Sequence, residues 1–363
     1  MLLKDKKFYR MFLVLCLPIV LQNVISLSVN LTDNLMLGSY AESALSGVTA
    51  VNQIQFIYQN LLIGIGDGLV ILASQYWGKK DTETIRKVAS IAMRTALVLM
   101  LVLFVIVSLF PEQAVGLFTN DAEIIAEGVK YLNIVRFTYP FFCVTTILLA
   151  VLRSTEVVKI AFYLSLSTLC INFWINWCLI YGRFGLPRLG VQGAAIGTLV
   201  ARIVECIIIL CYVAKKERNL GLKLRDFLHV DRSIMRDYYR VSLPILFISA
   251  MWGVNTAMQT AILGHLTSSA IAANSMASNL YLIVKTVAVG AASTTNVFIG
   301  KAIGEGDMKV VKQYAKTFQV MFLIMGICCG LILYALTEPV LALYSFSDES
   351  RELARTFMHL SLI

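Results

Sequence analysis

Long apolar segments recur along the whole chain and limit the folds that it can adopt. A helix needs about 20 predominantly apolar residues to cross a lipid bilayer. Ten segments have this length or begin to, at 11–37, 50–74, 88–110, 128–152, 159–182, 191–214, 240–264, 274–300, 314–336 and 354 onward. Only 15% of the residues are charged and 58% are hydrophobic, a balance outside the range of soluble domains. The sequence therefore predicts an all-α, polytopic membrane protein whose partner is the lipid bilayer.

The basic residues are distributed unevenly over these predicted spans. With the N-terminus placed inside, 23 of the 31 Lys and Arg residues fall at inner ends or in inner loops, and six fall at outer ones. Membrane proteins concentrate Lys and Arg on the cytoplasmic side. We therefore expect a multi-pass protein of the cell membrane (plasma or inner membrane) with a cytoplasmic N-terminus. The net charge of +9 follows from this topology and gives no reason to expect a nucleic-acid partner.

The chain repeats itself when it is shifted by 226 residues without a gap. The following proline and glycine pairs then coincide: Pro18 with Pro244, Gly38 with Gly264, Gly64 with Gly290, and Gly78 with Gly304. These pairs carry the argument, because apolar residues coincide often by chance in such a composition. The shift predicts two lobes of six helices, related by a pseudo-twofold axis along the membrane normal.

The repeat also divides the chain into domains. We expect an amino-terminal six-helix lobe over 1–214, a cytoplasmic linker over 215–239 and a carboxy-terminal lobe over 240–363. Ile363 corresponds to Phe137, within the fourth helix of the first lobe. The second lobe is thus incomplete, about ten helices are present, and we expect the native protein to be longer.

One carboxylate interrupts the first apolar segment. Asp33 stands five residues before Gly38, about 7 Å from the end of the segment at 1.5 Å per residue. An aspartate in the middle of a membrane helix costs about 2.5–3.5 kcal/mol on insertion scales. Such residues usually face a cavity and bind ions or protons. The alternative is that Asp33 caps a helix end near the outer interface.

Two amides and a hydroxyl occur at a similar depth in later spans. Asn172 and Asn176 are four residues apart, so they share one face of a helix. Thr198 lies about 12 Å from the outer end of the next helix, counted from Gly190. Their oxygens, together with the Asp33 carboxylate, would suit a proton or a hard monovalent cation. The alternative is ordinary hydrogen bonding between helices.

Other residues are candidates for a substrate cavity. Aromatic and methionine side chains can line a cavity for flat lipophilic cations, although at helical spacing they also serve as packing or lipid-facing residues. Lys285 stands alone in its helix and either lines the cavity or pairs with an acid elsewhere. The cavity candidates are Tyr58, Tyr139, Trp252, Met258 and Lys285.

Charged residues in two other helices have simpler interpretations. Arg202 and Glu205 are three residues apart and are expected to neutralise each other. Asp67 stands near the inner end of its helix, where a gate or loop contact is the simpler interpretation. The three histidines are scattered and no phosphate-binding loop of Walker type occurs, so we predict no enzyme and no cofactor apart from the proton or cation at Asp33.

Several motifs resemble those of multidrug and toxic compound extrusion (MATE) transporters. The motifs are Asp33-Asn34-Leu35-Met36-Leu37-Gly38, Gln75-Tyr76-Trp77-Gly78-Lys79-Lys80-Asp81, Leu152-Arg153-Ser154, the Asn172 and Asn176 pair, and Gly193-Ala194-Ala195. The resemblance covers the whole chain and is stronger in the first half. It implies twelve helices in two lobes around a V-shaped cavity, and export of organic cations in exchange for Na⁺ or H⁺.

The resemblance also assigns residues to the coupling site. Asp33 matches the first-helix carboxylate of the family, and Asn172, Asn176 and Thr198 match its cation partners in the amino-terminal lobe. One branch of the family carries a glutamate eight residues after the proline of the seventh helix, where this chain has Trp252. This departure favours coupling through the amino-terminal lobe.

The sequence therefore favours a monomeric exporter of amphiphilic organic cations, driven by antiport of Na⁺ or H⁺. A lipid-linked saccharide flippase of the same superfamily is one alternative, and it would need a more basic cavity, for which Lys285 is a hint. A membrane-embedded transferase is the other, and it would need paired acids or a His–Asp pair at the interface. The sequence has neither of these pairs.

Overall fold

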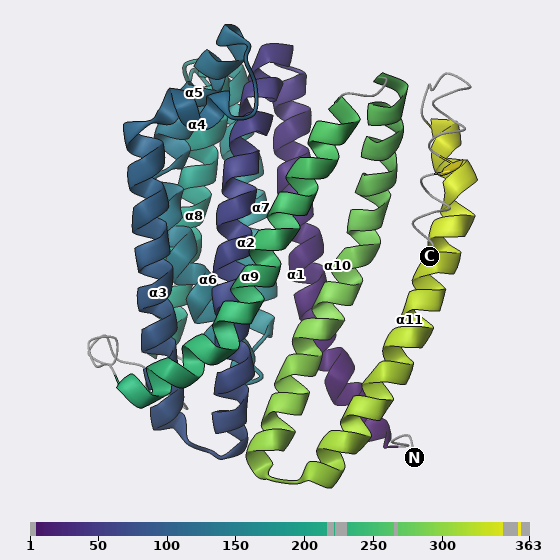
Figure 1. Cartoon of the computed structure of the whole chain (residues 1–363). Helices are drawn as coiled ribbons and strands as arrows, with labels where there is room; N and C mark the ends of the chain where they lie inside the picture. The colour runs from purple at the N-terminus through teal and green to yellow at the C-terminus, as the bar shows by residue number, and fades with distance from the viewer. Residues whose placement is uncertain (1–4, 216–220, 222–230, 265–267, 344–354, 357–363) are drawn as a thin grey trace.

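The computed structural model describes residues 5–215, 221, 231–264, 268–343 and 355–356. Over these residues the regular structure is α-helical, as predicted, and the long helices run side by side (Figure 1). The helices are α1 (Lys6–Gly38), α2 (Glu42–Gly78), α3 (Thr82–Leu109), α4 (Pro111–Gly116), α5 (Ala122–Val135), α6 (Thr138–Ser154), α7 (Lys159–Tyr181), α8 (Val191–Lys215), α9 (Arg232–Gly264), α10 (Ser268–Glu305) and α11 (Met308–Leu343).

Six of these helices are long and apolar enough to cross a membrane, namely α1, α2, α3, α7, α8 and α11. The pair α5 and α6 makes a seventh span if the two helices, which meet at 56°, cross together. The predicted seventh and eighth spans lie within α9 and α10. The N-terminus, the turn between α2 and α3 and the turn between α10 and α11 lie at one end of the bundle (Figure 1). These are three of the segments that the distribution of Lys and Arg places on one side.

The prediction of one continuous helix over 128–152 is wrong. The structure ends α5 at Val135 and starts α6 at Thr138. Pro140 explains the break, because proline has no backbone N–H and its ring collides with the carbonyl group four residues earlier, that of Arg136. The predicted linker, 215–239, includes residues outside the described ranges, and from Arg232 onward it forms the start of α9.

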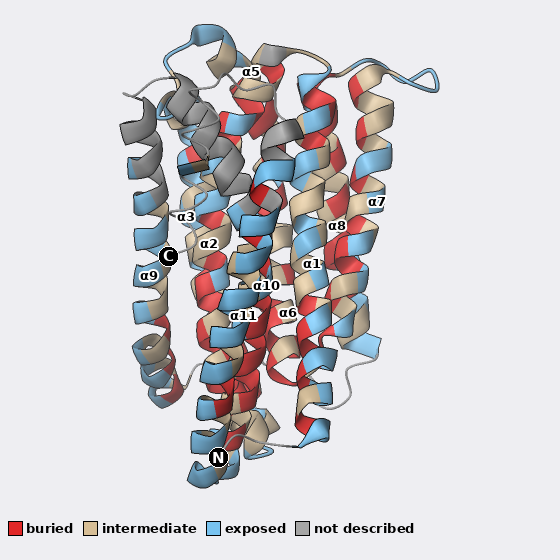
Figure 2. Ribbon diagram, turned by 90° about the vertical axis from the view of Figure 1, so that its right-hand side faces the viewer, coloured by how far each residue is buried: buried red, intermediate tan, exposed pale blue. Residues whose placement is uncertain are grey.

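Helix α2 lies in the middle of the bundle and contacts α1, α3, α5, α6, α9 and α10. Its inward side chains, such as Leu62 and Leu69, are completely buried. Buried residues gather on the inside of the bundle, while α9 and α11 show mostly exposed surface (Figure 2). The exposed side chains of α11 include apolar residues such as Leu323 and Leu331. An exposed apolar helix face is what contact with lipid requires.

Close contacts between α2 and α10 follow the 226-residue repeat. A methyl group added to Gly78 would overlap the carbonyl oxygen of Lys301, and one added to Gly304 would overlap that of Gln75. The repeat pairs Gly78 with Gly304 and Gln75 with Lys301, so each contact is the symmetric copy of the other. The predicted pseudo-twofold axis therefore passes between these two helices.

A second reciprocal contact involves the first helix of each half. A methyl group on Gly64 of α2 would lie 3.3 Å from the Leu246 side chain of α9, and one on Gly290 of α10 would meet Val20 of α1. The repeat pairs Gly64 with Gly290 and Val20 with Leu246. Each half thus packs its first helix against the second helix of the other half.

Helix α1 consequently connects both halves of the molecule. Near its N-terminus, Phe8 and Phe12 pack with Phe298 of α10 and Phe318 of α11, with ring centroids 5.4–6.1 Å apart. Farther along, α1 packs against α7. A change in the position of α1 therefore acts on α10 and α11 as well as on α7.

We expect Gly304→Ala to lower the free energy of unfolding by about 1–3 kcal/mol, because the added methyl group overpacks the contact between α2 and α10. The midpoint of thermal unfolding in detergent micelles measures the effect. Gly326→Ala on α11 is the control, since a methyl group there has no atom within 4 Å. Equal midpoints for the two variants would show that the backbone contact does not stabilise the bundle.

Candidate functional site

Two glycines bring α7 and α8 into close contact. A methyl group on Gly193 would lie 2.8 Å from the carbonyl carbon of Leu179, and one on Gly197 would overlap the side-chain oxygen of Asn176. The glycine- and alanine-rich start of α8 therefore allows α7 to approach closely. Because Gly197 has no side chain, the Asn176 amide lies directly against α8.

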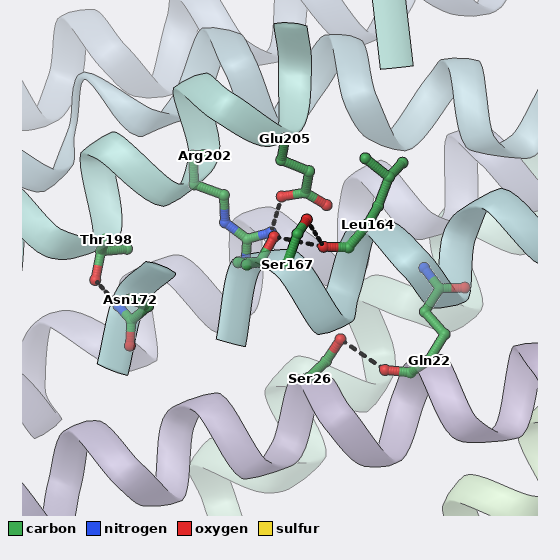
Figure 3. A network of polar contacts seen from close by, with 9 residues as sticks. Gln22, Ser26, Leu164, Ser167, Asn172, Thr198, Arg202 and Glu205 are labelled. Carbon is green, nitrogen blue, oxygen red and sulfur yellow. Dashed lines mark hydrogen bonds and ion pairs between the residues drawn. The ribbon is translucent and has the colours of Figure 1, made fainter. Parts of the chain in front are cut away.

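A chain of hydrogen bonds starts from Asp33 and links three helices. Asn176 donates through Nδ2 to Asp33 Oδ1 at 2.6 Å and to Asn172 Oδ1 at 3.2 Å. Asn172 donates to Thr198 Oγ1 at 3.3 Å, a contact that Figure 3 shows. The Thr198 hydroxyl in turn donates to the carbonyl oxygen of Ala194 at 3.0 Å. The structure thus brings together all four residues that the sequence analysis placed in a cation site.

The burial of these side chains distinguishes between the two interpretations of Asp33, an ion-binding residue and a helix cap at the outer interface. Asp33 is only 8% exposed, Asn172 is 1% exposed and Asn176 is fully buried. Asp33 lies inside α1 and its carboxylate meets α7, so it is not a helix cap at the interface. The Asn176 side-chain oxygen has no hydrogen-bond partner. A buried carboxylate beside an unsatisfied amide oxygen is costly, and such groups in membrane proteins are typically functional.

Two further polar residues belong to this site and were not predicted. The Tyr131 side chain of α5 lies close to the side chains of Thr198 and of Gln55 in α2. Tyr131 is 3% exposed and lies near Asp33. The sequence did carry a signal for Tyr131, because a tyrosine in an apolar segment needs a hydrogen-bond partner for its hydroxyl when it is buried. The site therefore draws on five helices rather than the three that the sequence analysis proposed.

A polar cavity of about 230 Å³ lies next to this site. Gln22, Ser26 and Asn30 line it from one face of α1, at spacings of four residues that lead toward Asp33. Phe142 of α6 and Arg202 of α8 contribute to the opposite wall. The cavity and the hydrogen-bonded chain are thus adjacent along both α1 and α8.

Two ion pairs balance the charge of this cavity. Arg202 bonds to Glu205 at 2.7 Å, which confirms that these two residues neutralise each other (Figure 3). Arg153 of α6 lies 3.6 Å from Asp67 of α2 and donates to Ser293 of α10 at 3.1 Å. Asp67 lies 11 residues before the end of α2 and takes part, through Arg153, in a contact between helices of both halves.

The residues predicted for a substrate cavity lie elsewhere. Tyr58 and Tyr139 are each 1% exposed, and the Tyr58 hydroxyl donates to the Tyr139 carbonyl oxygen at 2.8 Å. They stabilise the core of the first lobe because their rings stack there, so they do not line the polar cavity. Lys285 lies 3.3 Å from the centroid of the Trp252 ring, and Met258 is 58% exposed. These three belong to α9 and α10, apart from the Asp33 site.

We expect Gly197→Ala to displace the Asn176 amide from Asp33, because the new methyl group would occupy the position of the amide oxygen. The cost is about 1–3 kcal/mol of overpacking, measured by thermal unfolding. Gly253→Ala, where a methyl group has no atom within 4 Å, is the matched control. In the double variant, Asn176→Ala should remove most of this cost, since substitutions at residues in contact do not change the free energy of unfolding additively. Additive losses would contradict the proposed collision.

Comparison with known proteins identifies relatives over nearly the whole chain. The MatE family model matches residues 18–178 and 244–363. The probable multidrug resistance protein YoeA of Bacillus subtilis is 24% identical over 348 residues, covering 95% of this chain and 75% of that protein. The probable multidrug resistance protein NorM of Thermotoga maritima is 23% identical over 342 residues, covering 94% and 73%.

Solved structures show the same fold. A multidrug resistance MATE family transporter of the MOP superfamily in an outward-facing conformation superposes with a TM-score of 0.86 at 17% identity, covering 97% of this chain and 78% of that one. A mutant of the Vibrio cholerae MATE transporter VcmN superposes with a TM-score of 0.87 at 16% identity, covering 97% and 79%. The relatives carry the names of transporters and not of enzymes. This chain belongs to the MatE family of multidrug transporters.

Proposed function

We propose that this protein exports amphiphilic organic cations from the cell in exchange for Na⁺ or H⁺, and that Asp33 binds the coupling ion. The observation that carries the proposal is the buried Asp33 carboxylate, held at 2.6 Å by an amide of another helix. The names of the curated relatives, multidrug resistance proteins, support the substrate class. The proposal includes a monomer in the cell membrane with its N-terminus in the cytoplasm.

The chemistry of the site suits a monovalent ion. Asp33 contributes one carboxylate, and Asn172, Asn176 and Thr198 add neutral oxygens. Among the residues that the structure describes, no three His, Cys, Asp or Glu side chains gather into a metal site. A single negative charge in a buried place is neutralised by one proton or one Na⁺, whereas a divalent cation would leave a positive charge in low dielectric.

The position of the Asn176 amide bears on the choice between the two ions. Its Nδ2 group, a donor, points toward Asp33 and Asn172. Its oxygen points toward α8 at Gly197. Binding of Na⁺ by Asn176 would therefore require its amide to turn, while a proton would need only the free Asp33 oxygen. This geometry favours a proton in the conformation described.

Coupling also requires that the ion changes the position of a helix. A ligand shifts a conformational equilibrium only if it binds the two states differently. Helix α1 carries Asp33 in its second half, while its first half packs on α10 and α11. Neutralisation of Asp33 weakens its hydrogen bond to α7, since charged acceptors form stronger hydrogen bonds than neutral ones. The resulting shift of α1 would reach the second half of the protein.

The two alternative functions have less support. A flippase for anionic, lipid-linked saccharides would need a basic cavity, yet the two arginines of the described cavity are each paired with an acid. Lys285, the residue that suggested this alternative, lies against Trp252. For a transferase, no paired catalytic acids line the described cavity, because Asp67 and Glu205 are bound to arginines.

We expect Asp33→Asn to abolish cation-driven efflux of ethidium from loaded proteoliposomes, because asparagine keeps the shape of the side chain and loses its charge. A pH gradient and a Na⁺ gradient are applied separately to identify the ion. Asp121→Asn is the control: it makes the same change in an exposed helix cap, where asparagine caps equally well. Equal efflux by wild type and Asp33→Asn under both gradients would refute the coupling role.

A further inference from the structure

Arg202 is a permanent positive charge placed one helical turn from the proposed cation site. On α8, Thr198, Arg202 and Glu205 are spaced so that they share one face, which Figure 3 shows. Thr198 belongs to the hydrogen-bonded chain of Asp33, and Glu205 holds Arg202 at 2.7 Å. Arg202 thus pairs with Glu205 and lies one helical turn from the hydrogen-bonded chain that ends at Asp33.

Arg202 and Glu205 face a cavity that reaches α1 at Asn30, three residues before Asp33. Arg202 and Glu205 both line the 230 Å³ polar cavity, as do Ser26 and Asn30 of α1. The Arg202 guanidinium also lies 4.7 Å from the centroid of the Phe142 ring, where a cation is attracted to the ring face. Glu205 is 5% exposed, so its carboxylate needs a positive partner to remain charged.

Arg202 carries the opposite charge to Asp33 and lies one turn of α8 from Thr198, which belongs to the same hydrogen-bonded chain. The charged or titratable groups that face Asp33 among the described residues are Arg202 from α8 and Tyr131 from α5, while α7 presents the amides of Asn172 and Asn176. An ionised Asp33 without a counter-charge would be costly at this burial. A guanidinium cannot lose its proton in a protein, so Arg202 is always able to supply that charge.

We propose that Arg202 competes with the coupling ion for Asp33, pairing with Asp33 when the ion has left and with Glu205 when the ion is bound. This inference rests on the proposed function of Asp33. Arg202 is a positioning residue that stabilises the ion-free state and so promotes ion release. Glu205 holds Arg202 away from Asp33 and so favours ion binding.

The proposal predicts opposite effects for the two partners of one ion pair. Arg202→Gln removes the competitor, so the ion should bind about tenfold more tightly, as expected for one unit charge at moderate distance and effective dielectric. Glu205→Gln frees Arg202 to pair with Asp33, so the ion should bind about tenfold more weakly. If the Arg202–Glu205 pair served only to stabilise α8, both variants would weaken binding of the ion.

The experiment titrates the detergent-solubilised full chain with NaCl at constant pH, and separately with acid in the absence of Na⁺. The readout is tryptophan fluorescence, since Trp174 and Trp177 lie on α7 beside Asn176. For Arg202→Gln we expect the Na⁺ midpoint to fall about tenfold, or the acid midpoint to rise by about one pH unit. Arg202→Lys keeps the charge and should stay close to wild type.

The double variant Arg202→Gln/Glu205→Gln keeps the test valid if a single variant fails to fold. It removes both charges of the pair together, so neither is left buried without its partner, which is the main cost of breaking such a pair. We expect it to bind the ion as tightly as Arg202→Gln, because the competitor is absent in both. A double variant with the midpoint of wild type would mean that the pair acts only through its summed charge, and the competition would be refuted.

The failures of the two proposals can be told apart. If wild type and Asp33→Asn respond alike to both titrations, the coupling role of Asp33 fails, and the competition fails with it. If Asp33→Asn abolishes the wild-type response but Arg202→Gln and Glu205→Gln shift the midpoint in the same direction or not at all, only the competition is overturned.

Discussion

The close approach of α7 and α8 is the constraint on which the candidate site depends. Gly193 and Gly197 remove the side chains that would separate the two helices, and the amide of Asn176 fills the space. This amide then holds the Asp33 carboxylate of α1. Burial of one carboxylate is thus made possible by the absence of two side chains on a different helix. The geometry of the site is therefore set by packing first and by hydrogen bonding second.

The two halves of the molecule are alike in packing and different in chemistry. The glycine contacts of α2 and α10 occur in reciprocal pairs that follow the 226-residue repeat. The residue that the repeat pairs with Asp33 is Gln259, which carries no charge. The two halves therefore share their helix packing, but only the first half has a charged residue at this position. This agrees with the proposed coupling site in the amino-terminal lobe.

Much of this arrangement could be predicted from the sequence. Polar residues in apolar helices are few, so Asp33, Asn172, Asn176 and Thr198 were recognisable, and helical spacing put the two asparagines on one face. Tyr131 and Gln55 were not predicted, because a sequence without known helix neighbours does not show which distant side chain a hydroxyl will meet. The break in the fourth span was a missed signal, since Pro140 stands within it. The complete burial of Tyr58 and Tyr139 was not predictable, because the burial of an aromatic ring depends on the helices around it.

The contact between α2 and α10 has a mechanical consequence. At Gly78 and Gly304 the nearest atoms across the contact between the two helices are backbone atoms. Helices joined by interdigitated side chains must repack those side chains before they can tilt, because the interior is closely packed. A contact made by backbone atoms lacks this interlock, so it resists a tilt of one half against the other less than interdigitated side chains would.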